Sequence, residues 1–419
     1  MLIARIRAGF SQDAKGALRM LMACCGLHAL HDGFTDALYV FLPLWQNDFG
    51  LTYASIGLLR SLYTSAMAGM QLPVSLMAHR TSHRRILMAG TLLTGAAYLA
   101  VGLSPSFLVL ALALIIAGFG SSTQHPIAAA LVSQAYPGRA SRGALGTYNF
   151  AGDLGKAAIP AAIAWLSVAM TWRQSALLLG LAGLLFAAAA SIALPESPAA
   201  PANEPLSPAR SSPPQARVPL SRVLSRAFSL LLSIGIIDTA TRMGFLTFLP
   251  FLLEAKGADL TTIGFAFSLV FIGGAAGKLV CGFLGGRIGV VGTVLATEGL
   301  TALGIIALIP LPMTAGLMVM PLIGVALNGT SSVLYGTVPE LVPASSRERA
   351  FGVFYTGVLG AGALAPVLYG LASDRIGVPP MMVLVAALVL LTLPLVWLLG
   401  PFLSSLESEA LAGQDRPRA

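Results

Sequence analysis

Two histidines and two aspartates lie close together in an otherwise apolar stretch near the start of the chain. His28 and Asp32 are four residues apart, as are Asp32 and Asp36, and His31 directly precedes Asp32. On a helix, side chains four residues apart share one face. Repulsion between neighbouring carboxylates and burial both favour proton binding by one of them, and histidine titrates near neutral pH. We therefore predict that His28, His31, Asp32 and Asp36 handle protons.

Asp36 has an alternative role, because it can also pair with Arg60 or Arg242 from another segment. An ionisable residue at the centre of a membrane-spanning helix costs about 2.5–3.5 kcal/mol and usually has a function. The proton-handling role is therefore favoured for Asp32, and the pairing of Asp36 stays open.

Other ionisable residues also lie within apolar segments. Asp153 and Lys156 are three residues apart, and Asp238 and Arg242 are four apart, so each pair can meet on one helix face. Such pairs fit a static structural role as well as they fit substrate binding. The sequence suggests no partner for Glu298. The residues expected to line a substrate cavity are His125, Asn149, Asp153, Lys156, Asp238, Arg242, Lys278 and Asn328, and the expected gating residues are Arg60, Arg80 and Arg287.

Sequence signatures of catalysis are missing. There is no phosphate-binding loop, no Cys/His cluster with zinc spacing and no nucleophile elbow. We therefore predict that the protein is not an enzyme and uses neither a cofactor nor a metal. Cys24, Cys25 and Cys281 all lie in apolar segments and are expected to be buried thiols rather than a disulfide framework.

The elements that carry these residues are long apolar segments. Of the 419 residues, 56% are apolar and only 10% are charged, and the mean hydropathy is +0.82, whereas about a quarter of the residues of a soluble domain are charged. A spanning helix needs roughly 20 mostly apolar residues. We predict an all-α polytopic membrane protein with twelve spans, at 20–45, 54–78, 85–104, 106–134, 143–170, 173–194, 224–254, 260–285, 290–310, 313–340, 349–373 and 379–400.

The spans form two groups of six. The stretch 195–221 is rich in proline, serine and alanine and is expected to be a cytoplasmic linker. The predicted organisation is therefore a first six-helix bundle (1–194), the linker, a second bundle (222–400) and a cytoplasmic tail (401–419). With both termini in the cytoplasm, 18 of the 25 Lys and Arg residues lie on the cytoplasmic side and three on the other, as the positive-inside rule requires.

The two halves also repeat each other. Phe41-Leu-Pro43 recurs as Phe248-Leu-Pro250, and Ile56-Gly57 as Ile263-Gly264, each 207 residues later. Further matches at an offset of 206 continue the series in the same order. Because each half has an even number of spans, the halves have the same orientation. Such a parallel repeat is typical of major facilitator transporters.

The whole chain resembles the major facilitator superfamily. Its loop motif has partial copies at 77–85 and 282–289 and a closer copy at Gly370-Leu-Ala-Ser-Asp374-Arg375-Ile-Gly377. The first half is also similar to the fosmidomycin-resistance family of bacterial inner-membrane exporters. That similarity rests on His28-x-x-x-Asp32, Pro43, Gly118-Phe-Gly120-Ser-Ser-Thr-Gln-His125-Pro126 and Gly152-Asp153-Leu-Gly155 with Pro160. The resemblance implies twelve helices in two bundles and transport by alternating access.

Three functions are compatible with these features. The leading hypothesis is a proton-coupled exporter (an antiporter) of a small organic molecule, anionic or zwitterionic if the buried cations bind it. The second is a proton-coupled importer (a symporter) of an organic acid, and the remote third is a non-transporting receptor. The expected partners are the substrate, protons and the lipid bilayer of a bacterial inner membrane. The net charge of +8 is spread over short loops, so no nucleic acid is expected, and the protein is expected to be a monomer.

Overall fold

The computed structural model describes residues 2–78, 80–194, 224–343 and 346–414. The predicted linker at 195–221, His79 of the loop motif and the end of the predicted tail lie outside these ranges. The described residues form helices and contain no strand. The helices are α1 (Leu2–Phe49), α2 (Tyr53–Met77), α3 (His83–Gly102), α4 (Phe107–Ser121), α5 (Gln124–Ala135), α6 (Arg139–Ala169), α7 (Trp172–Ala193), α9 (Arg226–Ala255), α10 (Leu260–Leu308), α11 (Met313–Thr337), η1 (Val338–Glu340), α12 (Arg347–Ile376), α13 (Val378–Leu390) and α14 (Thr392–Gln414).

These helices coincide with all twelve expected segments, and the expectation of an all-α polytopic membrane protein is confirmed. Helix α1 begins before the predicted first span, α14 extends into the predicted tail at 401–419, and three divisions of the chain differ from the sequence-based ones. The fourth segment is divided into α4 and α5, and the twelfth into α13 and α14, whereas α10 joins the eighth and ninth. Within α10 the chain turns at Gly289, whose φ of +72° only glycine adopts readily.

Nine helical segments among the described residues are long and apolar enough to cross a membrane. The helices α1, α2 and α6 are not among these nine. Both α1 and α6 carry buried ionisable residues, including Asp32 on α1 and Asp153 on α6. Such helices require protein neighbours that shield their charges from lipid.

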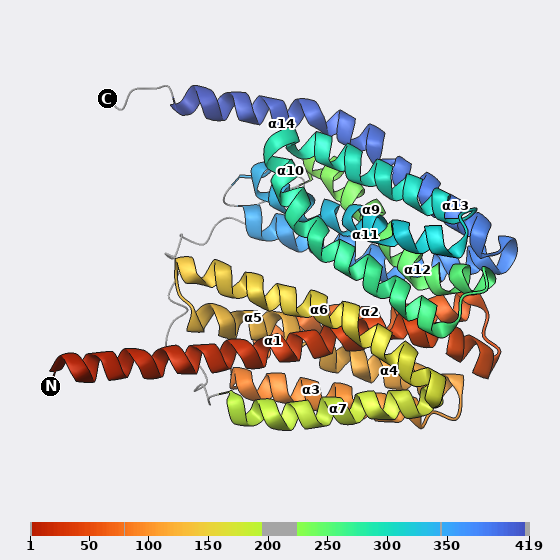
Figure 1. The fold of residues 1–419 in the computed structure, drawn as a ribbon. Coiled ribbons are helices and arrows are strands. Elements are labelled where there is room, and N and C mark those ends of the chain that lie inside the picture. The colour runs from red at the N-terminus through yellow and green to blue at the C-terminus, as the bar shows by residue number, and fades with distance from the viewer. Residues whose placement is uncertain (1, 79, 195–223, 344–345, 415–419) are drawn as a thin grey trace. The chain divides into compact units, whose positions relative to one another are not determined.

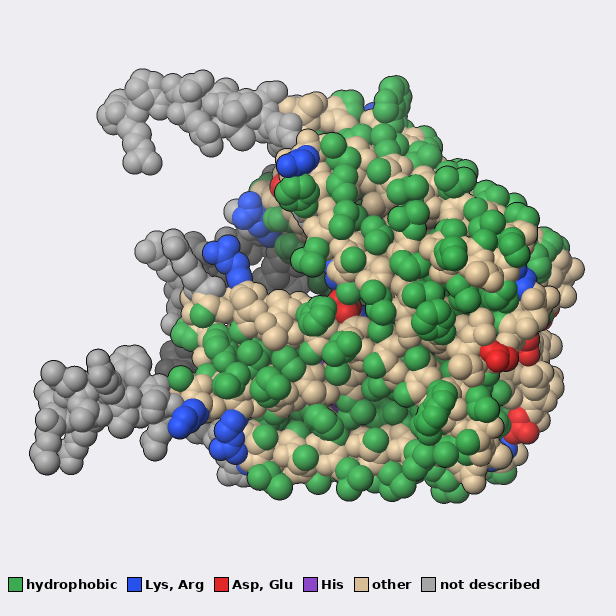
Figure 2. Space-filling view, in the orientation of Figure 1, with side chains coloured by type: hydrophobic (Ala, Val, Ile, Leu, Met, Phe, Trp, Pro, Cys, Tyr) green, Lys and Arg blue, Asp and Glu red, His purple; other side chains and the backbone are tan. Residues whose placement is uncertain are grey.

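The chain divides into two compact units. Unit 1 consists of Met1–Leu51, Leu59–Ser207 and Asp259–Ser268, and unit 2 of Thr52–Leu58, Pro208–Ala258 and Leu269–Ala419. In unit 1, α1 packs against α5, α6 and α7, and α3 packs against α4 and α7 (Figure 1). The central part of α1 is therefore covered by protein. Apolar side chains dominate the visible surface of α3 and α7, with charged side chains toward the helix ends (Figure 2), as lipid contact requires.

In unit 2, α9 packs against α11, α12, α13 and α14. The first turn of α2 belongs to this unit. Its backbone N–H groups at Tyr53 and Ala54 donate hydrogen bonds to the two carboxylate oxygens of Asp374, at 2.7 and 3.0 Å. A negative side chain stabilises the positive N-terminal end of a helix. The aspartate of the closest loop-motif copy thus caps α2.

Glycine at position 155 allows α6 to approach α1 closely. A Cβ atom at Gly155 would lie 1.9 Å from the backbone oxygen of Ala29. We expect Gly155→Ala to lower the free energy of unfolding by about 1–3 kcal/mol, the usual cost of overpacking, measured by thermal unfolding of the purified protein in detergent. Gly146→Ala on the same helix is the control, because a Cβ there has nothing within 4 Å. Equal melting temperatures of the two variants would contradict this account of the helix contact.

Candidate functional site

Helix α1 places His28 and Asp32 one turn apart on the same buried face. The distance from His28 Nε2 to Asp32 Oδ2 is 3.3 Å, and the two residues are only 3% and 5% exposed. The His28 ring stacks on the ring of Tyr148, with centroids 4.1 Å apart, and its Nδ1 lies 2.8 Å from the backbone oxygen of Tyr148. The orientation of the imidazole is therefore fixed by α6.

This orientation determines which nitrogen atom of His28 carries the hydrogen. The Tyr148 carbonyl only accepts hydrogen bonds, so Nδ1 of His28 carries the hydrogen. In a neutral imidazole the other nitrogen, Nε2, is then an acceptor, and it faces a carboxylate oxygen of Asp32. Two acceptors repel each other. The contact becomes attractive when one proton is added, either to the imidazole or to the carboxyl group.

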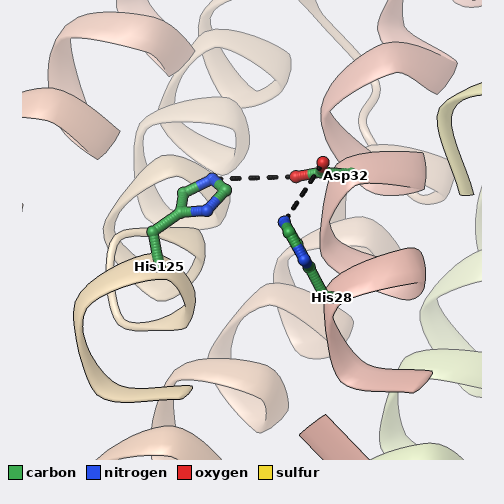
Figure 3. A group of neighbouring side chains, drawn as sticks. All are labelled: His28, Asp32 and His125. Carbon is green, nitrogen blue, oxygen red and sulfur yellow. Dashed lines mark ion pairs between the residues drawn. The ribbon is translucent and has the colours of Figure 1, made fainter. Parts of the chain in front are cut away.

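A lysine and a histidine from other helices also contact Asp32. Lys156 Nζ, from α6, lies 3.2 Å from Asp32 Oδ2 and 3.8 Å from Asp153 Oδ1. His125 Nε2, from the first turn of α5, lies 3.7 Å from Asp32 Oδ1. His28 and His125 thus approach the same carboxyl group from different helices (Figure 3). We call the group formed by His28, Asp32, His125, Asp153 and Lys156 the Asp32 cluster.

The Asp32 cluster is closed on one side and accessible on the other. A Cβ atom at Gly152 would lie 2.7 Å from Asp32 Oδ2 and from His28 Nε2, so only glycine leaves room for both groups at this position. By contrast, the side chain of His125 is 46% exposed and that of Lys156 is 30% exposed. Lys156 and His125 are therefore the accessible members of the cluster, while the side chain of Asp32 is only 8% exposed.

Asp36 lies in a different set of contacts. Its Oδ1 is 3.9 Å from Arg60 Nη2, and Arg60 also donates a 2.9 Å hydrogen bond to the Tyr39 hydroxyl. Asp36 and Arg60 are both nine-tenths or more buried. This arrangement corresponds to the alternative in which Asp36 pairs with Arg60.

His31 also points away from the Asp32 carboxyl group, toward hydroxyl groups. Its Nε2 lies 3.0 Å from Thr91 Oγ1, and its Nδ1 lies 3.4 Å from Ser121 Oγ. Thr91 donates its own hydrogen to the backbone oxygen of Leu87, so it accepts from His31. A neutral His31 satisfies both of its contacts. No sequence spacing links these hydroxyl groups to His31, so they cannot be identified from the sequence alone.

The remaining candidates are spread over both units. Asp238 is buried on α9, with Arg242 one turn along, and Asn328 donates a hydrogen bond to the backbone oxygen of Gly324 within α11. Arg287 stacks over the Phe283 ring at 4.4 Å. The exposed candidates are Arg80, Asn149, Lys278 and Arg287. The structure thus brings five of the predicted residues together, all in unit 1.

Three residues of the Asp32 cluster have the donor types of a metal site. The ligand atoms of His28, Asp32 and His125 lie within 4.8 Å of one another, and no other group of three metal-ligating side chains occurs in the described ranges. These residues could hold a divalent cation. The Lys156 ammonium group lies on the same carboxyl group and already supplies a positive charge, so we derive no chemistry from a metal.

The known proteins that are similar in sequence to this chain agree with the observed fold. The family model of the Major Facilitator Superfamily matches residues 24–237 and 231–417. The Probable sulfoacetate transporter SauU of Cupriavidus necator is 26% identical over 360 residues, which cover 81% of this chain and 83% of the relative.

Two solved structures are similar to most of the chain. A bacterial homolog of the human lysosomal transporter Spinster, in an inward-facing and occupied conformation, has a TM-score of 0.75 at 17% identity and covers 91% of this chain and 96% of that chain. A variant of the nucleoside transporter NupG has a TM-score of 0.73 at 14% identity and covers 92% and 99%. At these identities the likeness concerns the fold.

Proposed function

This chain belongs to the Major Facilitator Superfamily of membrane transporters, and we propose that it carries a small organic anion across the membrane together with a proton. It is a multi-pass membrane protein and not an enzyme. Membership confirms the superfamily part of the resemblance, whereas the similarity to fosmidomycin-resistance exporters stays a prediction. The bacterial inner membrane, cytoplasmic termini and a monomeric state are likewise part of the proposal.

The observation that carries the proposal is the position of Lys156. Its ammonium group is the solvent-accessible cation of the Asp32 cluster, and it contacts Asp32 at 3.2 Å. A substrate anion that binds Lys156 must compete with the Asp32 carboxylate for the same positive charge. Protonation of Asp32 removes that competition. Proton binding therefore strengthens anion binding, and by linkage anion binding strengthens proton binding.

The contact between His28 and Asp32 supports a proton as the coupling ion. It is attractive only when one proton is present on the pair, because His28 Nδ1 already donates to a backbone carbonyl. His125 faces the other oxygen of the same carboxyl group at 3.7 Å. The exposed His125 ring is a route by which the proton reaches the buried carboxyl group.

The substrate class follows from the charge of the site and from the relative. An anion fits the accessible Lys156 and His125 side chains. The relative SauU is named for sulfoacetate, a small organic acid. We therefore propose a small organic acid with a sulfonate or carboxylate group as the substrate, with sulfoacetate as the first compound to test.

The direction of coupling separates this proposal from export by antiport, the leading hypothesis from the sequence. In an antiporter the proton and the substrate displace each other, so acidification weakens substrate binding. In the arrangement around Asp32, the proton releases Lys156 for the substrate, so acidification strengthens binding. The geometry therefore favours the symport hypothesis for an organic acid.

Transport into proteoliposomes tests the proposal. We expect labelled sulfoacetate to accumulate when the outside is more acidic than the inside, and a pH-sensitive dye to report proton entry that depends on sulfoacetate. Binding of sulfoacetate to the detergent-solubilised protein should tighten between pH 8 and pH 6. Weaker binding at the lower pH, or proton exit on sulfoacetate entry, would overturn symport in favour of antiport.

If sulfoacetate neither binds nor moves, a panel of short sulfonates and carboxylates tests the proposed class of substrate. Failure of the whole panel would overturn the proposal that the substrate is an organic anion.

A further inference from the structure

Two acidic side chains contact each other in the interior of unit 2. Asp238 lies on α9, and Glu298 lies in the second half of α10, 60 residues further along the chain. Their side chains hydrogen-bond to each other, and the residues are only 4% and 1% exposed. The sequence suggests no partner for Glu298, and the structure supplies one.

A hydrogen bond between two carboxyl groups requires a proton. Carboxylates only accept hydrogen bonds, and two adjacent buried charges of one sign repel each other strongly. One of the two groups is therefore protonated in this arrangement. We propose that Asp238 and Glu298 form a second proton-binding site of the protein, which takes up and releases one proton within unit 2.

The surrounding hydroxyl groups give a proton on Glu298 a second acceptor. Thr297 donates its hydrogen to the backbone oxygen of Thr293 at 2.9 Å, so Thr330 is the donor in its 2.7 Å hydrogen bond to Thr297. Thr330 also hydrogen-bonds to Glu298. Because its one hydrogen is already used, Thr330 accepts in this contact and Glu298 donates. A proton on Glu298 can therefore be donated to Thr330 or to Asp238, one at a time.

Further donors are available for the deprotonated state. Thr241 lies one helical turn after Asp238, and Thr301 lies one turn after Glu298, so each shares a helix face with its acid. Both residues are 1% exposed, and neither hydroxyl oxygen has a hydrogen-bond partner in the described structure. Glu298 Oε1 is also buried and accepts no conventional hydrogen bond. The two hydroxyl groups are thus buried, one helical turn from the acids, and not used in another hydrogen bond.

Arg242 supplies the compensating positive charge. It interacts electrostatically with both acids, and its buried Nε makes no hydrogen bond. The other ionisable groups facing the pair are Tyr335 of α11, which interacts with Asp238 and Arg242, and Tyr355 of α12, whose ring lies 4.9 Å from that of Tyr335. With one proton bound, the two acids and Arg242 are neutral together. Loss of the proton leaves a net charge of −1 in the protein interior.

This site is independent of the proton proposed for the Asp32 cluster. Its groups belong to unit 2 and share no residue with that cluster. Proton uptake here does not require that the substrate is sulfoacetate or that Asp32 is the coupling residue. A transporter with both sites binds two protons instead of one.

Infrared difference spectroscopy of the full-length protein in lipid nanodiscs tests the inference. We expect a protonated-carboxyl C=O band that disappears when the pH is raised and shifts in D2O. Glu298→Gln keeps the shape and the hydrogen-bond donor of the protonated acid, and it should remove this band and one titrating proton per molecule. Asp32→Asn should leave the band in place, which separates this site from the Asp32 cluster.

Other results of the same experiment would overturn the proton-binding site or replace it by a sodium site. A band unchanged in both Glu298→Gln and Asp238→Asn would overturn the inference. Loss of the band on addition of sodium ions at constant pH, with potassium as the control, would show a sodium site in place of a proton site. If Glu298→Gln does not fold, Asp238→Asn and Glu298→Asp provide the test, because each should shift the band while the protein keeps its cooperative melting transition.

Discussion

Asp32→Asn protein is expected to lose accumulation of the organic anion driven by a proton gradient. Asparagine has no proton to release, so Lys156 and His125 stay available to the substrate at any pH. We expect accumulation to fall at least about tenfold, within the 5–150-fold range of typical coupling free energies. Exchange of labelled for unlabelled substrate, which needs no net proton movement, should persist and lose its pH dependence. Both rates are measured in the same proteoliposomes.

Asp48→Asn is the matched control for this prediction. Asp48 is an aspartate of the same helix, and it forms a 2.9 Å ion pair with Arg173 outside the Asp32 cluster. Its side chain is 42% exposed, and surface ion pairs contribute roughly 0–1 kcal/mol. The Asp48 variant should therefore transport like the wild type. Accumulation retained in Asp32→Asn would remove Asp32 from the coupling mechanism.

The positions of the spanning helices, and the residue pairs within each helix, follow from local sequence properties. Hydropathy over about 20 residues locates each span, and helical periodicity places His28 beside Asp32 and Lys156 beside Asp153, as observed. Local properties locate helix breaks less well. The division of the fourth span before Gln124 was not predicted, although Pro126 favours a helix start in this region.

Contacts between different helices cannot be predicted from these local properties. Lys156 is 124 residues from Asp32 in the sequence, and Glu298 is 60 residues from Asp238. Nothing in a single sequence specifies which residues meet across such separations, because they depend on the packing of whole helices. Sequence spacing therefore predicts one partner for Lys156, which is Asp153, whereas the structure shows both Asp153 and Asp32. The sequence also leaves Asp36 with two possible partners, Arg60 and Arg242, and the structure pairs it with Arg60.

Gly152 shows a further limit of prediction from sequence. It was noted only as part of a family motif, yet any larger residue at this position would collide with the Asp32 carboxyl group and the His28 ring. The requirement for glycine arises from the close approach of α6 to α1, which no local sequence pattern predicts.

Lys156→Gln is expected to weaken binding of the organic anion at least about tenfold, which corresponds to roughly 1.4 kcal/mol, measured by calorimetry on the detergent-solubilised protein. The substitution removes the accessible positive charge of the Asp32 cluster and leaves the carboxylates of Asp32 and Asp153 without it. The free energy of unfolding should also fall, by about 1–3 kcal/mol. A fully buried pair would lose about 3–5 kcal/mol, but the Lys156 side chain is 30% exposed.

The double variant Asp32→Asn, Lys156→Gln separates the structural role of Lys156 from its binding role. Removing both charges should restore most of the lost stability, because no unpaired carboxylate of Asp32 remains. Anion binding should stay weak, since the accessible cation is still missing, and Lys156→Arg should recover part of it. If the double variant regains both stability and anion binding, Lys156 acts only as a structural counterion, and the anion site must lie on other cations.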